Sequence, residues 1–318
     1  MAQSDRSPQP LDVHRSRSER WLRSPRVSTL TEAAQFVDDL GLALVFPADR
    51  IEAPSLWEAV AGEDVEPFAN GMGDDESAVW EWKDELPLHG STWYGKFLYR
   101  RGSFLSVDLL RALYPGEGQT DDHKDLDLIR EAHDIAEVLR GGPMSTAALR
   151  QHIGDRSRYD RAVGELHRSL LITSAGVEPQ RSGWPAALVD LTCRVFEVGG
   201  AMDHAYATRR FLDTIMSTTP RDLARAYGWS VPTARARLED LVAQDVAHRV
   251  DGGVYVTSGN NSPHLRKGPA PKATRKAAKA PPSTKRAREA KAPAKGAAPA
   301  TTPTKVVPAP KTTPRGAS

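Results

Sequence analysis

The side chains with the plainest chemical meaning in this sequence are basic, and they gather at its end. Residues 260–318 contain 14 Lys and Arg residues and one acidic residue, Glu289. Each basic side chain that neutralises a phosphate releases a condensed counterion, so such a segment binds nucleic acid with little regard to base sequence. Four residues stand for these basic runs: Lys272, Lys276, Lys285 and Arg286. We expect the segment to bind double-stranded DNA; RNA, anionic lipid and a solubilising role are the alternatives.

The rest of the chain carries the opposite charge. Residues 1–259 hold 29 basic and 40 acidic residues, a formal charge of −11, which the whole-chain value of +2 hides. The tail alternates Lys with Ala, Pro and Thr and resembles the C-terminal tails of linker histones and bacterial nucleoid proteins. Frequent proline and few large apolar residues predict an extended, disordered arm. The tail would supply affinity for DNA, and any selectivity must come from the body.

A second set of basic residues belongs to a pattern of helices around residue 230. Thr219 and Pro220 form a helix start, and Ser230 caps the next helix. Ala234, Leu238 and Leu241 form the apolar stripe of that helix. The residues largely off the stripe are Thr233, Arg235 and Arg237. They lie near the start of the helix, where they could meet a ligand.

Two strand-like runs follow this helix, with Arg249 in the first and the turn Asp251-Gly252-Gly253 between them. The order helix, helix, helix, hairpin resembles the winged-helix superfamily. In such domains the N-terminal part of the third helix enters the major groove of DNA. We therefore expect Thr233, Arg235, Arg237 and Arg249 to contact DNA. The acidic residues of the same segment leave open that the unit packs against protein instead.

A similar order of elements occupies about residues 126–196. Its long helix, from Arg156 to Leu171, carries four arginines: Arg156, Arg158, Arg161 and Arg168. These side chains are either a track for phosphates or a solvated helix face.

The N-terminal part combines aromatic and charged residues. Thr29 and Glu32 have the spacing of a capping box at the start of a helix. Residues 80–87 and 93–96 hold three of the seven tryptophans together with charged side chains. Such a group forms either a base-stacking pocket or an aromatic core with salt bridges at its edge.

Length and composition set the remaining limits. A chain of 318 residues with disordered ends has room for two or three small domains. The single Cys193 excludes an internal disulfide and a cysteine-based zinc site. No eighteen-residue apolar window or secretory signal is present, and no phosphate-binding glycine loop or metal-ligand spacing calls for a cofactor or metal. We expect a cytoplasmic, nucleoid-associated protein without membrane segments.

The expected fold class is mainly α with small β wings (α+β), built of tandem winged-helix domains with disordered termini. The expected parts are a disordered N-terminus at 1–20, a winged-helix-like domain with the Trp-rich segment at 21–120, a second winged-helix domain at 121–200, a third at 201–258, and the disordered basic tail at 259–318.

Three features in this order resemble the AlkZ/YcaQ family of bacterial DNA glycosylases, and most closely its shorter, AlkZ-related members. They are Leu40-Gly41-Leu42 with an apolar run up to Pro47, the Trp-containing segment that ends in Leu86-Pro87, and the tandem winged-helix units. The resemblance covers about residues 22–257. It implies winged-helix domains that surround DNA, and excision of alkylated or crosslinked bases.

The resemblance also implies where the active site belongs, and the chain departs from it there. The family has a glutamine, an apolar residue, and aspartate or glutamine just after the Leu-Gly segment. This chain has Leu44, Val45 and Phe46, which cannot position water or stabilise a cationic sugar. A histidine of the family's Trp-containing segment is also absent. The carboxylates that could substitute for the missing residues are Asp38, Asp84 and Glu85.

The sequence thus supports a non-enzymatic DNA-binding protein on a glycosylase-like scaffold, with non-specific affinity from its tail. The alternative is a DNA glycosylase that flips out a lesion and uses a relocated carboxylate. A protein-interaction scaffold that binds its partner through winged-helix faces is the third hypothesis.

Overall fold

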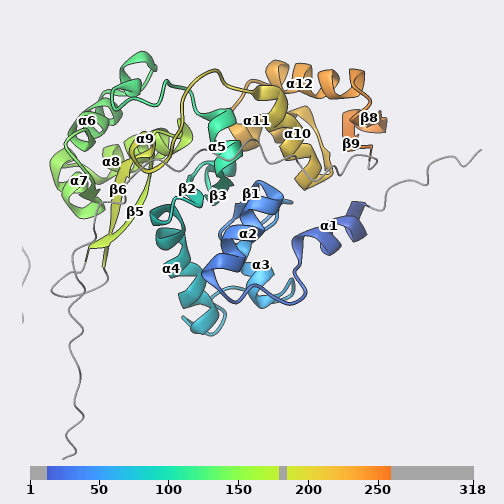
Figure 1. Ribbon diagram of the computed structural model, residues 1–318, viewed down its shortest axis with the longest axis horizontal. Coiled ribbons are helices and arrows are strands. Elements are labelled where there is room, and N and C mark those ends of the chain that lie inside the picture. Colours follow the sequence, from blue (N-terminus) through green and yellow to red (C-terminus); the bar gives the residue numbers. More distant parts are fainter. Residues whose placement is uncertain (1–12, 179–184, 259–318) are drawn as a thin grey trace, which may run out of the picture. The chain divides into compact units, whose positions relative to one another are not determined.

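One arrangement of helices and strands occurs three times along the chain. The computed structural model describes residues 13–178 and 185–258 (Figure 1). We call the three copies the first unit (30–106), the second unit (130–191) and the third unit (204–257). Each runs helix, strand, helix, helix, strand, strand.

The elements of the units have the following bounds. The first unit contains α2 (Leu30–Leu40), β1 (Leu42–Leu44), α3 (Leu56–Ala61), α4 (Asp74–Leu88), β2 (Thr92–Lys96), the 3-10 turn η1 (Leu98–Arg100) and β3 (Gly102–Ser106). The second contains α6 (Arg130–Leu139), β4 (Met144–Ser145), α7 (Thr146–Ile153), α8 (Arg156–Arg168), β5 (Ile172–Glu178) and β6 (Ala186–Leu191). The third contains α10 (His204–Ile215), β7 (Ser217–Thr218), α11 (Pro220–Tyr227), α12 (Val231–Ala243), β8 (Ala247–Val250), η3 (Asp251–Gly253) and β9 (Val254–Thr257).

Shorter elements lie outside or between the units. They are α1 (Val13–Trp21), α5 (Val107–Leu113), η2 (Asp122–Asp125) and α9 (Thr192–Val195).

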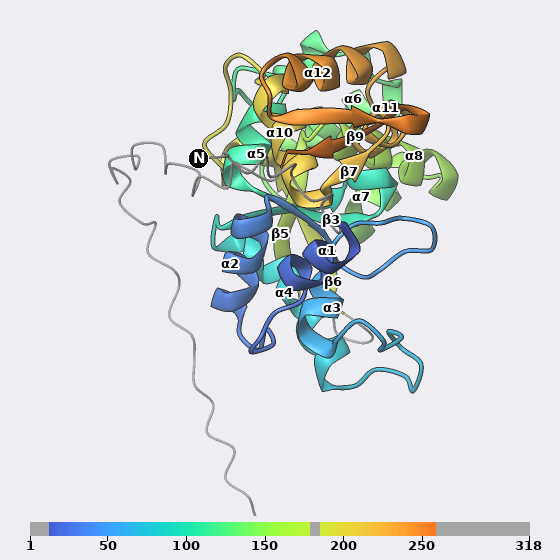
Figure 2. The same ribbon diagram turned by 90° about the vertical axis from the view of Figure 1, so that its right-hand side faces the viewer.

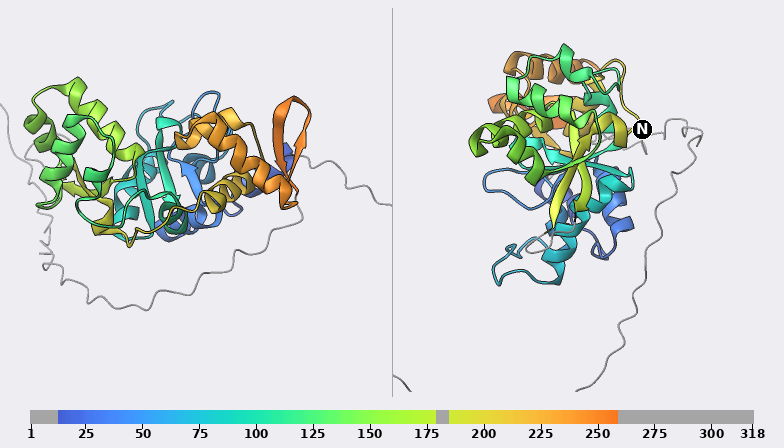
Figure 3. Two further views of the ribbon diagram at one scale, coloured as in Figure 1. Left: turned by 90° about the horizontal axis from the view of Figure 1, so that it is seen from above. Right: turned by 90° about the vertical axis from the view of Figure 1, so that its left-hand side faces the viewer.

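Each unit has one small antiparallel sheet with the same topology. The strand orders are β1-β3-β2, β4-β6-β5 and β7-β9-β8, so the last strand of each unit is central. The last two strands pair as a hairpin, the wing, which is seen for β8 and β9 in orange in Figure 3. The fold is therefore α+β with tandem winged-helix units, as the sequence predicts.

Local sequence explains why the third helix starts where it does in the second and third units. Ser230 accepts a hydrogen bond from the backbone N–H of Thr233, and Asp155 caps α8 in the same way. The capping box predicted at Thr29 and Glu32 is present at the start of α2. These caps depend on residues three positions apart, so they can be read from sequence.

Buried apolar side chains join the units to one another. One cluster contains Trp93 of β2, Leu166 of α8 and Phe211 of α10, so it draws on all three units. A second cluster, around Phe36 and Trp57, lies within the first unit. The described residues thus form one compact unit, and the domain boundaries near residues 120 and 200 stay a prediction.

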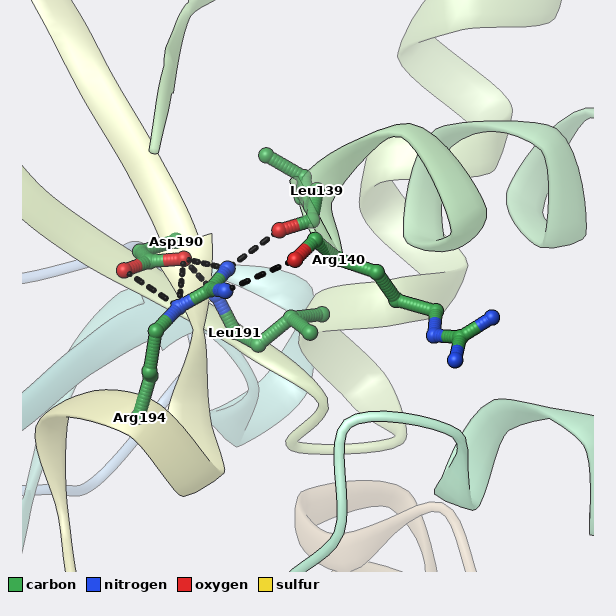
Figure 4. Close-up of polar contacts among 5 residues, drawn as sticks. All are labelled: Leu139, Arg140, Asp190, Leu191 and Arg194. Atoms are coloured by element: carbon green, nitrogen blue, oxygen red, sulfur yellow. Dashed lines mark hydrogen bonds and ion pairs between the residues drawn. The ribbon is translucent and has the colours of Figure 1, made fainter. Parts of the chain in front are cut away.

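The C-terminus of the first helix in each unit is capped by side chains from outside that helix. The guanidinium of Arg194 pairs with Asp190 and donates to the carbonyl oxygens of Leu139 and Arg140 at the end of α6 (Figure 4). Arg210 of α10 donates to the carbonyl oxygens of Asp38 and Asp39 at the end of α2. These cations meet the unpaired carbonyls and the negative end of the helix dipole.

Helix α1 performs the same role for α10 and corrects one expectation. Arg20 donates to the carbonyl oxygen of Asp213, and the indole N–H of Trp21 donates to that of Thr214 at 2.9 Å. Residues 13–20, expected to be disordered, are therefore helical and docked. Local pattern could not predict this helix, because its partners are nearly 200 positions away. Residues 1–12 lie outside the described part.

Candidate nucleic-acid interface

The third helix of the third unit exposes the face on which the sequence places its DNA contacts. Ala234, Leu238 and Leu241 are buried, and Arg235 is exposed. Thr233 and Arg237 are half-buried. Figure 2 shows α12 beside the β7–β9–β8 sheet. The apolar stripe thus faces inward, and the N-terminal half of the helix offers a hydroxyl and two guanidinium groups.

The charges of this face are only partly neutralised. Within the described residues Arg235 has neither an ion pair nor a side-chain hydrogen bond. Arg237 donates to the Asp240 carboxylate at 3.1 Å, and Arg249 of the wing lies 3.7 Å from the carboxylate of Glu239. Exposed pairs of this kind contribute little and exchange readily for other anions. Arg235 is the strongest candidate for a DNA contact on this face.

The turn before α12 adds an aromatic pair that the sequence reading missed. The rings of Trp229 and His204 lie 4.6 Å apart, and Tyr227 contacts Trp229 edge-on. Burial, and then the nearby guanidinium of Arg237, lower the pKa of His204 below its ordinary value. The pair holds the turn that orients the start of α12. In the sequence, the only signal for this aromatic pair is Trp229, directly before the helix cap Ser230.

Helix α8 carries its four arginines on an exposed surface. Arg156 lies 3.7 Å from Asp160, and Arg158 lies 3.8 Å from Glu131. Arg161 and Arg168 are exposed and form no ion pair with any residue that the structure describes. They are seven positions apart and so share one helix face. The structure leaves both readings of this helix open, a phosphate track and a solvated face.

The third helix of the first unit differs from the other two. The Lys83 ammonium group pairs with Asp84, whose other carboxylate oxygen accepts from Ser174 of β5 at 2.7 Å. Lys83 and Asp84 are 8% and 7% exposed, and the ammonium lies 4.7 Å from the ring centre of Trp80. The buried Lys83–Asp84 pair and the buried Trp93 fit the reading of an aromatic core with a salt bridge, whereas Trp80 is 43% exposed. Asp84 holds α4 against the second unit.

The three carboxylates proposed as relocated catalysts lie on two helices of the first unit, α2 and α4. Glu85 is exposed on α4 next to the buried Asp84. Asp38 is exposed at the end of α2, and its backbone carbonyl accepts from Arg210. Helices α2 and α4 contact one another.

Leu44, Val45 and Phe46, which the sequence resemblance aligns with the family's catalytic residues, lie in or against the apolar interior. Leu44 is fully buried in β1, and Val45 donates its backbone N–H to the carbonyl oxygen of Gly102 and accepts from the backbone N–H of Trp57. The ring of Phe46 lies 4.9 Å from that of Phe68 and 5.9 Å from that of Trp57. These side chains can pack but cannot move a proton.

Lys272, Lys276, Lys285 and Arg286 of the tail lie outside the described residues. Burial raises the pKa of the Cys193 thiol, which disfavours the nucleophilic thiolate. Across residues 13–178 and 185–258 no group of three or more His, Cys, Asp or Glu side chains could hold a metal ion. None of the described helices is long and apolar enough to cross a membrane.

Comparison with known proteins gives one family and one solved structure. The sequence profile of a family described as AlkZ related matches residues 27–226. The chain is similar to the structure of Streptomyces sahachiroi DNA glycosylase AlkZ, with 14% identity, a TM-score of 0.47, and coverage of 77% of this chain and 69% of that one. No curated protein sequence matches the chain. Because the match spans more than half of the chain, the chain belongs to the AlkZ-related family.

Proposed function

We propose that this protein binds double-stranded DNA without catalysing base excision, using the exposed faces of α12 and α8 for contact and its basic tail for added affinity. The observation that carries the proposal is the exposed Arg235, without an ion pair among the described residues, on the third helix of a winged-helix unit. In this fold that helix is the one that enters the major groove. A cytoplasmic, nucleoid-associated location is part of the same proposal.

The apolar residues at positions 44–46 favour binding over catalysis. A glycosylase must stabilise a cationic sugar and position water, and Leu44, Val45 and Phe46 offer neither charge nor hydrogen-bonding side chain. Asp84, the most buried of the substitute carboxylates, is engaged by Lys83 and Ser174. It would have to leave both partners to act on a sugar.

Equilibrium binding to a labelled duplex at several salt concentrations tests the proposal. We expect Arg235→Ala to weaken binding by about fivefold or more, because one favourable phosphate or base contact is lost. Arg130→Ala is the matched control, since Arg130 is a highly exposed arginine on the first helix of the second unit. A chain that ends at Thr257 should retain binding at moderate salt. Loss of all binding on that truncation would refute a role for the winged-helix body.

The alternative function, a DNA glycosylase, is favoured by membership of the AlkZ-related family. Incubation with alkylated duplex followed by alkali detects it, because excision leaves alkali-labile abasic sites. We expect no cleavage above the level of a protein-free reaction. Cleavage that disappears in Asp38→Asn or Asp84→Asn would replace the proposed function with the enzymatic one.

A further inference from the structure

We propose that the β2–β3 hairpin of the first unit binds the sugar–phosphate backbone of DNA and bridges the basic surfaces of α8 and α11. This inference rests on the proposed DNA binding and adds to it a contact that the sequence reading did not identify. It gives the first unit a role in binding through its wing, since the exposed charges of its third helix are carboxylates.

The hairpin concentrates positive charge in a short, exposed segment. Lys96, Arg100 and Arg101 fall within six positions, and all three are exposed. No side-chain hydrogen bond or ion pair engages them anywhere in the described ranges 13–178 and 185–258. The body carries an excess of acidic residues, so three unpaired cations together are a local exception to its charge. Unpaired cations at a surface are available to phosphate oxygens.

The turn of the hairpin is held in a conformation that its residues disfavour. Tyr99 and Arg100 have φ values of 51° and 61°, in the left-handed region that residues other than glycine rarely adopt. Leu98 is fully buried, and the ring of Tyr99 lies 5.2 Å from the guanidinium carbon of Arg225 on α11. Packing of Leu98 and Tyr99 therefore fixes the turn, and the exposed Arg100 and Arg101 follow directly after it.

The hairpin lies between two other basic elements. β2 contacts α8, and η1 contacts α11, an arrangement that Figure 1 shows near the centre of the described chain. At the α8 contact, burial and the nearby Lys96 lower the pKa of His167 to about 3, so this imidazole stays neutral. The charges at that contact are then those of Lys96 and the exposed Arg168.

The basic surface continues on the α11 side. Arg221 and Arg225 are exposed and one helical turn apart. Of the two carboxylates that affect Tyr99, Glu52 pairs with Arg17, whereas Asp222 accepts only from the neutral Thr219 hydroxyl at 2.7 Å and keeps its negative charge. Cations therefore run from Arg168 of α8 across the hairpin to Arg221 and Arg225. A duplex backbone lying along this path would meet phosphate-binding groups from all three units.

The salt dependence of DNA binding by the full chain tests the inference. For the variant Lys96→Ala/Arg100→Ala/Arg101→Ala we expect the slope of log Kobs against log salt to become shallower by about 2 to 3, since each phosphate contact contributes roughly 0.9. The matched control is Lys124→Ala/Arg130→Ala/Arg140→Ala, which removes the same charge near α6. Its slope should change by less than about 0.5, because none of these side chains lies on the path.

Substitution of Arg101 alone separates a loss of DNA contact from a loss of folding. Arg101 has an ordinary extended backbone, with φ −102° and ψ 157°, so Arg101→Ala leaves the strained turn intact. Its thermal unfolding midpoint should equal that of the parent chain, and its slope should fall by about 0.9.

Two results would overturn the inference and remain distinguishable. If the hairpin and control variants have equal slopes while Arg235→Ala still weakens binding, the hairpin does not contact DNA and the proposed function stands. If Arg235→Ala and the hairpin variants all bind like the parent chain, the proposed function fails together with the inference.

Discussion

Helices α4 and α12 occupy the same place in two copies of one fold, but their surroundings differ. Helix α4 contains six acidic residues and one Lys, and it packs against β5 of the second unit. Helix α12 has both of its arginines in its N-terminal half, and the first of them, Arg235, is exposed. Element order alone therefore does not identify a helix that reads DNA. Burial and the sign of the exposed charge do.

The difference follows from what each helix neutralises internally. On α4 the only basic residue, Lys83, forms a buried ion pair with Asp84. The other carboxylates of this helix have no cation on the same helix to neutralise them. On α12 the acidic residues lie in the C-terminal half, where Glu239 accepts from the hydroxyl of Tyr255 and lies near Arg249 of the wing. The first unit thus uses its third helix for assembly, and the third unit leaves its own available for a ligand.

The largest expected effect concerns the buried pair of α4. Asp84→Ala leaves the Lys83 ammonium buried without a counterion and Ser174 without an acceptor, so we expect unfolding free energy to fall by about 3 kcal/mol. Asp240→Ala, which breaks the exposed pair of α12 with Arg237, should change it by less than about 0.5 kcal/mol. Urea unfolding of both variants makes the comparison. Equal losses of unfolding free energy in the two variants would show that the α4 ion pair is no more important for stability than the exposed pair of α12.

The glycines that end neighbouring helices give the next test. Gly41 has φ 83°, and an added Cβ would overlap the side chain of Arg210. Gly228 has φ 73° and open space around it. Gly41→Ala combines strain with overlap and should lower the free energy of unfolding by about 3 kcal/mol, against about 1 kcal/mol for Gly228→Ala. Thermal unfolding measures both, and a larger loss for Gly228→Ala would contradict the tight junction at the end of α2.

A pH dependence extends the comparison to α8, where His167 in the last turn is buried although the start of the helix is exposed. The pKa of His167 is lowered from 6.5 to about 3 because burial disfavours the charged imidazole. Below pH 6.5 the unfolded chain binds a proton that the folded chain does not, so stability falls as pH drops from 6.5 toward 3. Between pH 6.5 and 5 this amounts to about 1.5 kcal/mol.

His167→Leu should remove that part of the pH dependence. Urea unfolding at pH 6.5 and pH 5 then shows a smaller difference for the variant than for the parent chain. Identical differences in the two proteins would mean that His167 takes up a proton in the folded state.

The smallest expected effect is the change in DNA affinity when acidic residues of α4 are neutralised. Asp74→Asn/Asp75→Asn removes two exposed carboxylates from the start of that helix and should change affinity by less than about twofold, because salt screens exposed charges that lie outside the proposed contact path. Fluorescence anisotropy at physiological salt measures it beside Arg235→Ala. A gain of tenfold would place the duplex next to α4 and end the distinction between the helices.

Much of the fold was readable from the sequence, and the residues show why. The helix starts at Thr29, Thr219 and Ser230 depend on hydrogen bonds over three positions, and the apolar stripe of α12 depends on helical period. The unit at the N-terminus was harder to recognise, because its third helix carries a buried Lys and Asp where an apolar stripe is expected. The hairpin cations Lys96, Arg100 and Arg101 were missed since two of their neighbours, Tyr99 and Arg225, meet only in the folded chain.

The sequence by itself determined the helix caps, the three winged-helix units, the opposite charges of body and tail, and the apolar residues at positions 44–46. These properties depend on composition or on residues a few positions apart. Only the tertiary structure decided that Asp84 is paired with Lys83, and that α4 packs against β5 while Arg235 of α12 is exposed. It also decided that Arg194 caps the end of α6, that Arg210 caps the end of α2 and that Arg20 caps the end of α10. Each of these depends on groups brought together by packing, most of them from distant parts of the chain, and local periodicity does not encode which partner will arrive.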